Sequence, residues 1–322
     1  MILVAGSANL DFVVRAPHIP APGETVLGSD FKTFAGGKGA NQAIAACRAG
    51  GVTTGLLLAL GRDSFSEPIE ASLTAAGVAL HVVRVDDLPT GTAFICVSDD
   101  AENAITVAPG ANLALRPEHL PDLQGTQYLL LQLETPLQTV AAYAAAARKS
   151  GVKVMLNAAP AQALPPSLLA LVDVLVVNKG ELATVSDCTG TIAQCLQNLP
   201  GVPCIVVTLG TKGCCARNDG HIVLQSAFAI TPVDTTAAGD TFCGVLAASL
   251  AQKVLLPQAL EQASAAAALA CTRPGAQSSI PTHADIDIFL AGQRTAGATK
   301  HSDNAELATY AGFSQPTLDP DT

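Results

Sequence analysis

The stretch VDTTAAGDTF, residues Val233–Phe242, organises the rest of the chain. Apolar residues recur at offsets of three and four after it, which predicts a helix that begins near Ala238. The amides of Ala237, Ala238 and Gly239 would then lie at a helix N-terminus, where unpaired N–H groups and the helix dipole favour an anion. Asp240 stands beside this anion pocket, where a carboxylate can accept a proton from an attacking hydroxyl. Taken alone, the stretch fits equally well an Asp240 that only charges the helix start.

Composition limits the possible partners of the protein. The chain has 322 residues, of which 49% are hydrophobic and only 14% are charged, so it can bury the core of one large α/β domain or of two smaller ones. The net charge of −10 argues against nucleic acid and anionic membranes as partners. A site for a polyanion must therefore be built locally, from amides, a metal ion and a few cations.

Cysteine usage and hydropathy predict a soluble, cytoplasmic protein. The nine cysteines include no CxxC pair and no nearby histidine cluster at metal-binding spacing, which is typical of free thiols in a reducing compartment. The N-terminus lacks a basic region followed by a long apolar run, and no apolar stretch reaches transmembrane length.

Strand and helix patterns alternate along most of the chain, which predicts a mostly parallel sheet covered by helices on both faces, an α/β three-layer sandwich. The predicted strands are 2–5, 53–59, 82–85, 128–132, 152–156, 174–177 and 204–208. The predicted helices are 36–50, 68–76, 136–149, 192–198 and 258–272. Polar residues follow several of these strands, which places a ligand site at the carboxyl edge of the sheet.

Two segments, 12–36 and 90–108, interrupt this alternation. The first contains strand candidates at 25–27 and 31–34, and the second predicts a hairpin of 92–97 with 104–107. We interpret both as a small β-sheet lid that excludes water from the site. The main domain would span 1–294, and residues 295–322 would form a mobile tail with one helical turn at 304–311.

Several motifs near the predicted strand ends fit more than one role. Asn9 and Asp11 suit either hydroxyl recognition or turn formation. The glycine-rich segment 36–43 allows close backbone approach to a ligand, but it matches neither a Walker A loop nor a dinucleotide fingerprint. Asn178 and Glu181, three apart at a helix start, suit Mg²⁺ held through water or a surface polar pair. The turn 208–213 suits phosphate contacts or a simple hairpin.

Together these motifs resemble the PfkB-type carbohydrate kinase family, and within it the kinases of ribose. The resemblance covers roughly residues 1–291 and rests on nine motifs in order: Gly6–Asp11 (GSANLD), Pro22–Thr25 (PGET), Gly36–Ala43 (GGKGANQA), Gln132–Glu134 (QLE), Asn157–Ala161 (NAAPA), Asn178–Glu181 (NKGE), Thr208–Gly210 (TLG), Asp234–Phe242 (DTTAAGDTF) and Gly275–Gln277 (GAQ). It implies a ribokinase-like three-layer sandwich with a β-sheet lid, and transfer of a phosphoryl group from ATP to the 5-hydroxyl of D-ribose.

The resemblance also implies a role for each matching residue. Asp240 would be the catalytic base, with an anion hole formed by Ala237, Ala238 and Gly239. The sugar would be bound by Asn9, Asp11, Gly37, Lys38, Gly39, Asn41, Glu134 and Asp240. ATP would be bound by Asn178, Thr208, Gly210, Thr211, Gly213, Gly239 and Ser264, and Glu181 would hold Mg²⁺ through water. K⁺ would be bound, largely through carbonyls, by Asp234, Thr236, Ala270, Arg273, Gly275 and Ser279. The lid would join two chains into a homodimer.

Three positions depart from the family pattern. Lys179 replaces an acidic neighbour of Asn178, the loop 62–66 lacks a glycine after its hydrophobic residue, and Ser264 stands where relatives often have a histidine near adenine. Other readings therefore stay open: a kinase of 2-deoxyribose, fructose or adenosine, or a catalytically silent sugar-binding relative. A dinucleotide-dependent oxidoreductase is disfavoured because the glycine fingerprint is missing.

Overall fold

A nine-stranded sheet forms the centre of the protein, in the order β13-β12-β11-β10-β9-β8-β1-β4-β5. The computed structural model describes residues 1–100, 102–295 and 300–313. The strands are β1 (Ile2–Ala5), β4 (Thr54–Gly61), β5 (Ala79–Val85), β8 (Tyr128–Leu131), β9 (Lys153–Asn157), β10 (Val174–Asn178), β11 (Cys204–Thr208), β12 (Cys214–Asn218) and β13 (His221–Gln225). All neighbouring strands pair in parallel except at β12, which is antiparallel to both β11 and β13.

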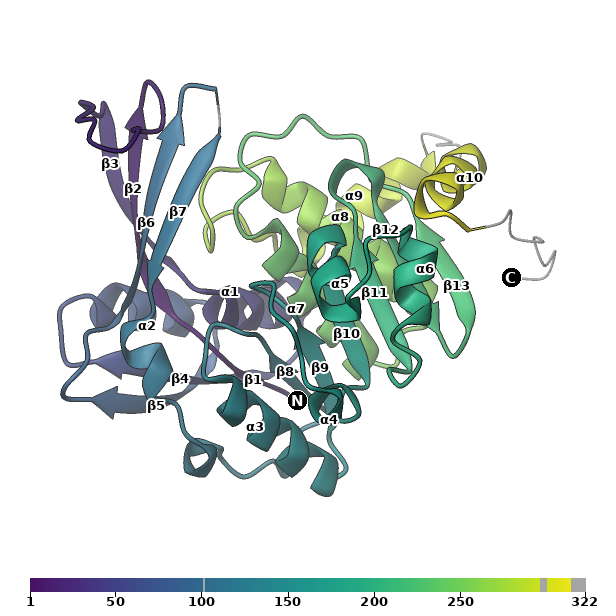
Figure 1. Cartoon of the computed structure of the whole chain (residues 1–322), viewed down its shortest axis with the longest axis horizontal. Helices are drawn as coiled ribbons and strands as arrows, with labels where there is room; N and C mark the ends of the chain where they lie inside the picture. The colour runs from purple at the N-terminus through teal and green to yellow at the C-terminus, as the bar shows by residue number, and fades with distance from the viewer. Residues whose placement is uncertain (101, 296–299, 314–322) are drawn as a thin grey trace.

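Helices cover both faces of this sheet (Figure 1). One face carries α1 (Lys38–Ile44), the π-helical turn η1 (Ala45–Ala49), α2 (Ser66–Ala75), α7 (Ala238–Ala251), α8 (Leu256–Cys271) and α9 (His283–Thr295). The other carries α3 (Leu137–Lys149), α4 (Pro166–Leu169), α5 (Lys179–Ser186), α6 (Ile192–Gln197) and α10 (Lys300–Ala311). The α/β three-layer architecture expected from the sequence is confirmed.

The period of two along a buried strand explains why two cores form. On β1, Ile2 and Val4 pack into the core beneath α7, whereas Leu3 and Ala5 pack into the core on the opposite face. All four side chains are almost completely buried. Such a strand is apolar throughout because neither of its faces meets water.

The lid is a separate four-stranded sheet in the order β3-β2-β6-β7, which stands away from the main sheet in Figure 1. Its strands are β2 (Asn9–Ala16), β3 (Asp30–Gly36), β6 (Gly91–Ser98) and β7 (Asn103–Ala108). The predicted hairpin is confirmed as β6–β7. The expected strand at 25–27 was wrong, because these residues form no strand, and β2 instead starts at Asn9, earlier than expected.

The C-terminal segment contains more structure than the single helical turn that the sequence suggested. Helix α10 extends over twelve residues and buries Leu307, Ala308 and Ala311. The rest of the predicted tail, 296–299 and 314–322, lies outside the described residues. No helix in the described part of the chain combines the length and the apolarity needed to cross a bilayer.

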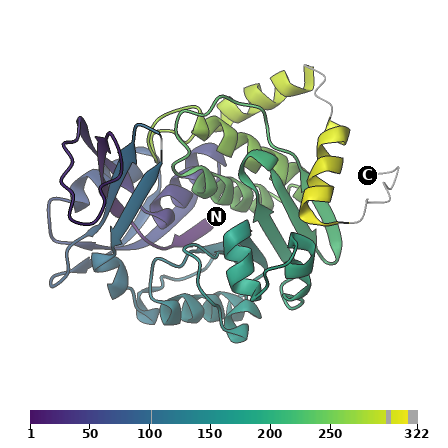
Figure 2. The same ribbon diagram turned by 45° about the horizontal axis from the view of Figure 1, so that its top comes forward.

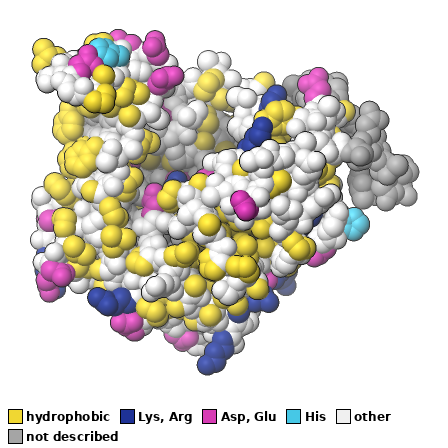
Figure 3. All heavy atoms as spheres, viewed as in Figure 1, with side chains coloured by type: hydrophobic (Ala, Val, Ile, Leu, Met, Phe, Trp, Pro, Cys, Tyr) yellow, Lys and Arg dark blue, Asp and Glu magenta, His cyan; other side chains and the backbone are white. Residues whose placement is uncertain are grey.

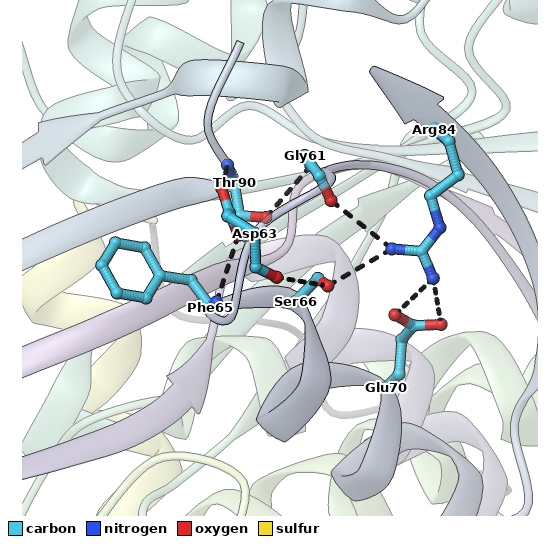
Figure 4. Close-up of polar contacts among 7 residues, drawn as sticks. All are labelled: Gly61, Asp63, Phe65, Ser66, Glu70, Arg84 and Thr90. Atoms are coloured by element: carbon cyan, nitrogen blue, oxygen red, sulfur yellow. Dashed lines mark hydrogen bonds and ion pairs between the residues drawn. The ribbon is translucent and has the colours of Figure 1, made fainter. Parts of the chain in front are cut away.

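The loop at 61–66, which departs from the family pattern, is organised around Asp63 (Figure 4). One carboxylate oxygen accepts the amide of Thr90 at 2.7 Å, and the other accepts the amide of Phe65 at 3.1 Å. Phe65 packs edge-on against Phe12 of the lid, with 5.4 Å between the ring centroids. The loop therefore ties the start of α2 to the segment that leads into β6 and supports the base of the lid.

Replacing Asp63 with alanine is expected to destabilise the protein by about 2 kcal/mol, because it leaves the two amides without their charged acceptor. Urea unfolding followed by circular dichroism measures the change. Asp86→Ala is the matched control, since among the described residues the ion-pair partner of Asp86 is Arg62 and both side chains are mostly exposed. Equal losses in the two variants would contradict the role given to Asp63.

Candidate active site

Several predicted site residues lie at or just beyond the carboxyl ends of main-sheet strands: Glu134 follows β8, Asn178 ends β10 and Thr208 ends β11. Strand β1 lies between β4 and β8. The next strands along the chain, β4 and β5, extend the sheet on one side of β1, and the later strands β8 to β11 extend it on the other side. Ligands of open parallel sheets bind at such a reversal, beyond the carboxyl ends of the strands. Figure 3 shows a hollow between the lid and the main body, with acidic and basic side chains at its base.

Asp240 lies in the first turn of α7 and is held by two amide side chains from α1. Asn41 Nδ2 donates to one carboxylate oxygen at 2.9 Å, and Gln42 Nε2 donates to the other at 2.9 Å. Asp240 is only 7% exposed, so these bonds fix its orientation. Asn41 Oδ1 is also buried and has no hydrogen-bond partner among the described residues, which leaves an acceptor for a ligand hydroxyl.

Gln42 was not singled out from the sequence. Its Nε2 also donates to Asn157 Oδ1 at the end of β9, and its Oε1 accepts from Gln132 Nε2 after β8 at 2.6 Å. This completely buried amide thus connects the end of β9 and the segment after β8 to Asp240. Its position next to Asn41 was the only available signal, and helical periodicity does not distinguish such a polar contact from ordinary packing.

The N-terminus of α7 has the form expected of an anion cradle. Ala237 caps the helix in the left-handed conformation with φ 58°, a strain that proteins tolerate mainly at functional sites. Gly239 is exposed, and a Cβ added to it would meet nothing within 4 Å. The amide of Ala238 donates to Thr235 O at 3.3 Å, a long bond. The approach to the helix start is therefore open at Gly239.

Asn9 and Asp11 lie on β2, not in a turn, so the extended backbone directs both side chains to one face. Asn112, which the sequence analysis missed, donates to Asn9 Oδ1 at 2.8 Å and fixes its amide. Burial, followed by the charges of Glu134 and Asp240, raises the pKa of Asp11 to about 7. Asp11 is thus near enough to both carboxylates to interact electrostatically.

Glu134 and Lys38 complete the acidic and basic groups of the site. Glu134 Oε2 accepts from Ser7 Oγ at 2.5 Å and from the amide of Lys38 at 3.2 Å. The negative charge of Asp240, and next that of Glu134, raises the pKa of Lys38 against the opposing effect of burial. Lys38 therefore stays protonated among carboxylates and balances part of their charge.

The glycines around Lys38 allow α1 to pack directly on the end of β1. Gly37 has φ 88°, and a Cβ on it would lie 2.7 Å from Ala8 Cα. A Cβ on Gly39 would lie 2.7 Å from the backbone of Gly6. From the sequence, the glycines were expected to let the backbone approach a ligand closely. In the structure, Gly37 and Gly39 lie against the protein's own backbone, and this contact positions Lys38 and Asn41.

Asn178 and Glu181 form a reciprocal cap at the start of α5. Asn178 Oδ1 accepts the amide of Glu181 at 2.8 Å, and Glu181 Oε2 accepts the amide of Asn178 at 2.7 Å. Burial is the main cause that raises the pKa of Glu181, and the charges of Lys38 and Asp240 also act on it. Glu181 thus faces the same charged group as Asp240, which fits an oxygen ligand for a water-coordinated Mg²⁺.

The turn after β11 is a hairpin to β12, one of the two readings left open. Gly210 and Gly213 adopt positive φ angles of 58° and 102°. Thr208 is the last residue of β11, and Thr211 lies in the turn that follows it. Ser264 lies on α8, with its hydroxyl 3.7 Å from Cys214 Sγ on β12. Ser264 therefore packs against the sheet strand that follows the turn.

The predicted K⁺ loops are joined by Asp234. Its Oδ1 accepts from both the amide and the hydroxyl of Thr236, and its Oδ2 accepts the amide of Gly275 at 2.8 Å. The Ala270 carbonyl accepts the amide of Arg273, and the Ser279 hydroxyl donates to Ala276 O. Oxygen atoms from carbonyls and one carboxylate are suited to a monovalent cation. Residues 1–100, 102–295 and 300–313 contain no group of three or more His, Cys, Asp or Glu side chains placed for a metal ion.

Comparisons with known proteins agree with this geometry. The family model for pfkB family carbohydrate kinases matches residues 1–283. A ribokinase from Haemophilus influenzae is 36% identical, over 90% of this chain and 98% of its own length. A deoxyribokinase from Salmonella typhi is 33% identical, over 90% of this chain and 98% of its own length.

A solved structure of Arabidopsis thaliana ribokinase, complexed with ribose and ATP, superposes with a TM-score of 0.82 at 32% identity. The match covers 90% of this chain and 98% of the Arabidopsis chain. The agreement thus extends through the main sheet, the lid and the site between them. The chain belongs to the pfkB family of carbohydrate kinases.

Proposed function

We propose that the protein is a ribokinase, which transfers the terminal phosphoryl group of ATP to the 5-hydroxyl of D-ribose and releases D-ribose 5-phosphate and ADP. One observation carries the proposal: Asp240, beside the open start of α7 at Gly239, accepts a hydrogen bond from Asn41 and is near enough to Asp11 for their charges to interact. The Haemophilus relative and the Arabidopsis complex with ribose and ATP support the choice of substrates.

The residues of the site divide this reaction between them. Asn9, Asp11, Asn41 and Glu134 bind the sugar hydroxyls and orient the 5-hydroxyl toward Asp240, which accepts its proton. The amides at the start of α7 stabilise the negative charge on the transferred group. Lys38 adds a positive charge close to Asp240 and Glu134. Phosphoryl transfer needs mainly such positioning and charge neutralisation.

Two ions complete the proposal. Mg²⁺, associated with Glu181 through water, would neutralise charge on the phosphates of ATP. K⁺, held by the loops around Asp234, would stabilise the turn that precedes the anion cradle, because Asp234 lies three residues before Ala237.

Turnover is expected to be faster in KCl than in NaCl at equal ionic strength, because Na⁺ is smaller and satisfies the carbonyl oxygens less well. A coupled assay of ADP release in the two salts measures the difference, and Asp234→Ala should lose most of it. Equal rates in both salts would remove K⁺ from the account.

Exposed apolar side chains on the lid support the proposal that the protein forms a homodimer. The strands and loop of the lid expose Leu27, Phe31, Phe94 and Ile105, each with more than half of its surface accessible in the single chain. A cluster of exposed apolar side chains on a sheet indicates a protein contact. Free cysteines throughout the described residues are consistent with a cytoplasmic location.

A substrate panel tests the proposal. ADP release is measured with Mg²⁺–ATP and D-ribose, 2-deoxy-D-ribose, D-fructose or adenosine at matched concentrations. The proposal expects the highest kcat/KM with ribose. A clear preference for 2-deoxyribose would favour the activity of the Salmonella relative, and no turnover with any acceptor would favour a silent binding protein.

A further inference from the structure

Helix α10 lies beyond the end of the family model. The family model ends at residue 283, whereas α10 spans Lys300–Ala311. The helix packs beside β13, the edge strand of the main sheet, and Figures 1 and 2 both show it there. This placement brings α10 next to the start of α5 and the turn 208–213, which the family resemblance assigns to ATP.

The packing of α10 is specific. Asn304 Oδ1 accepts from both the amide and the hydroxyl of Ser226, at 3.2 and 2.7 Å, just after β13. At the other end, Gly312 adopts φ 79° against Thr191, the cap of α6. Leu307, Ala308 and Ala311 are buried between these two anchors. The side chains of α10 from Asn304 to Ala311 therefore have fixed positions relative to the sheet.

Tyr310 on α10 contacts two lysines, Lys179 at the start of α5 and Lys212 in the turn 208–213. Lys179 Nζ lies 5.1 Å from the centroid of the Tyr310 ring, and it donates to the phenol oxygen at 3.4 Å. Lys212 Nζ lies 4.7 Å from the same centroid. Lys179 directly follows Asn178, and Lys212 lies inside the turn 208–213. A cavity of about 210 Å³ beside them is lined by Thr211, Lys212, Ser226, Ala227, Glu306, Leu307 and Tyr310.

The arrangement has a physical cost that a ligand would offset. Two ammonium groups on one ring repel each other, and each loses side-chain freedom when it is held there. A surface helix that only covered a strand edge would need no such pair. An anion between or beside the two lysines would turn the repulsion into attraction, and the side chains would already be ordered for it.

We propose that Tyr310 is a positioning residue that holds Lys179 and Lys212 at the nucleotide site, where they bind the polyphosphate of ATP. The proposal rests on the proposed function, since the resemblance to ATP-dependent kinases is what places ATP at Asn178 and the turn 208–213. It also explains the departure at position 179: a lysine replaces the acidic neighbour of Asn178 in a chain that has an aromatic ring to hold it.

Nucleotide binding without sugar tests this proposal separately from catalysis. Isothermal titration calorimetry measures the Kd of Mg²⁺–ATP and of adenosine for wild type, Tyr310→Leu, Tyr310→Phe and the double variant Lys179→Gln/Lys212→Gln. Tyr310→Leu is expected to weaken ATP binding about 3- to 10-fold, as two exposed cation–π contacts would. Adenosine binding should change less than twofold, and Tyr310→Phe should stay near wild type because the ring remains.

The controls separate positioning from a structural role. Lys149→Gln removes the same charge at the end of α3, away from α10, and should leave the Kd unchanged. Adding Tyr310→Leu to the double lysine variant should cause no further loss, because the ring acts through the lysines. Additive effects, or equal losses for ATP and adenosine, would overturn the proposal. If Tyr310→Leu lowers the melting temperature, the Kd of Mg²⁺–ATP for the double lysine variant decides instead. An unchanged Kd in the double lysine variant would also overturn the proposal. Wild-type protein that does not bind Mg²⁺–ATP would instead refute the proposed function.

Discussion

Asp240→Asn is expected to lower kcat by about 10²- to 10⁴-fold and to leave the KM for ribose within a few fold of wild type. The substitution keeps the size of the side chain but removes the acceptor for the proton of the 5-hydroxyl. Asn41 and Gln42 both donate to Asp240, so one of these bonds must also rearrange around the new amide. A coupled assay of ADP release at saturating ribose and ATP measures kcat.

Two controls make this result specific. Asp287→Asn makes the same change at an exposed position of α9 and should retain full activity. Thermal unfolding of Asp240→Asn should show a folded protein, which separates lost chemistry from lost structure. Turnover by folded Asp240→Asn at the wild-type rate would refute the role of Asp240 as the base.

Asp11→Asn is expected to raise the KM for ribose about 10- to 100-fold, because hydrogen bonds to a charged acceptor contribute about 1.5–3 kcal/mol. Since the pKa of Asp11 is raised to about 7, wild-type protein should bind ribose more weakly as the pH falls through 7 and the carboxylate takes up a proton. The plot of kcat/KM for ribose against pH from 5.5 to 9 should show this acid limb. Asp11→Asn should lose the limb at constant ionic strength, and an unchanged limb would assign it to another group.

The same group affects stability in the opposite direction. The folded protein binds the Asp11 proton more tightly than the unfolded chain does, so this carboxyl contributes stability that is complete below about pH 4 and is lost as the pH rises through 7. Asp11→Asn should therefore flatten the pH dependence of the unfolding free energy between pH 4 and 7. Urea unfolding at several pH values measures the slope, and an identical slope in the variant would contradict the buried position of Asp11.

Local patterns predicted the layers of the fold well because they record burial directly. Strand β1 and residues 174–177 of β10 are apolar throughout since helices cover both of their faces, and the buried residues of α8 recur at helical spacing. The start of β2 at Asn9 was not predictable in this way. Its pairing with β3 and β6 depends on segments more than twenty residues away in sequence. Helix α10 was underestimated for a similar reason, because its few buried residues pack against β13 and α6.

The site could be predicted where one motif carries the chemistry. The start of α7 was located correctly because glycine and other small residues at a helix start leave its N–H groups open to an anion. Gln42 and Asn112 were missed because each acts on another side chain, Asp240 and Asn9, and the partner becomes visible only after folding. Tyr310 belongs to the same group, since nothing near it in sequence indicates two lysines from distant loops.

A crystal structure of the protein with D-ribose and a non-hydrolysable ATP analogue tests the central claim most directly. The account predicts that the 5-hydroxyl lies within about 3.2 Å of a carboxylate oxygen of Asp240. The terminal phosphate should contact the amide of Gly239, in line with that hydroxyl. A sugar bound with its 5-hydroxyl away from Asp240, or phosphates bound away from the start of α7, would contradict it.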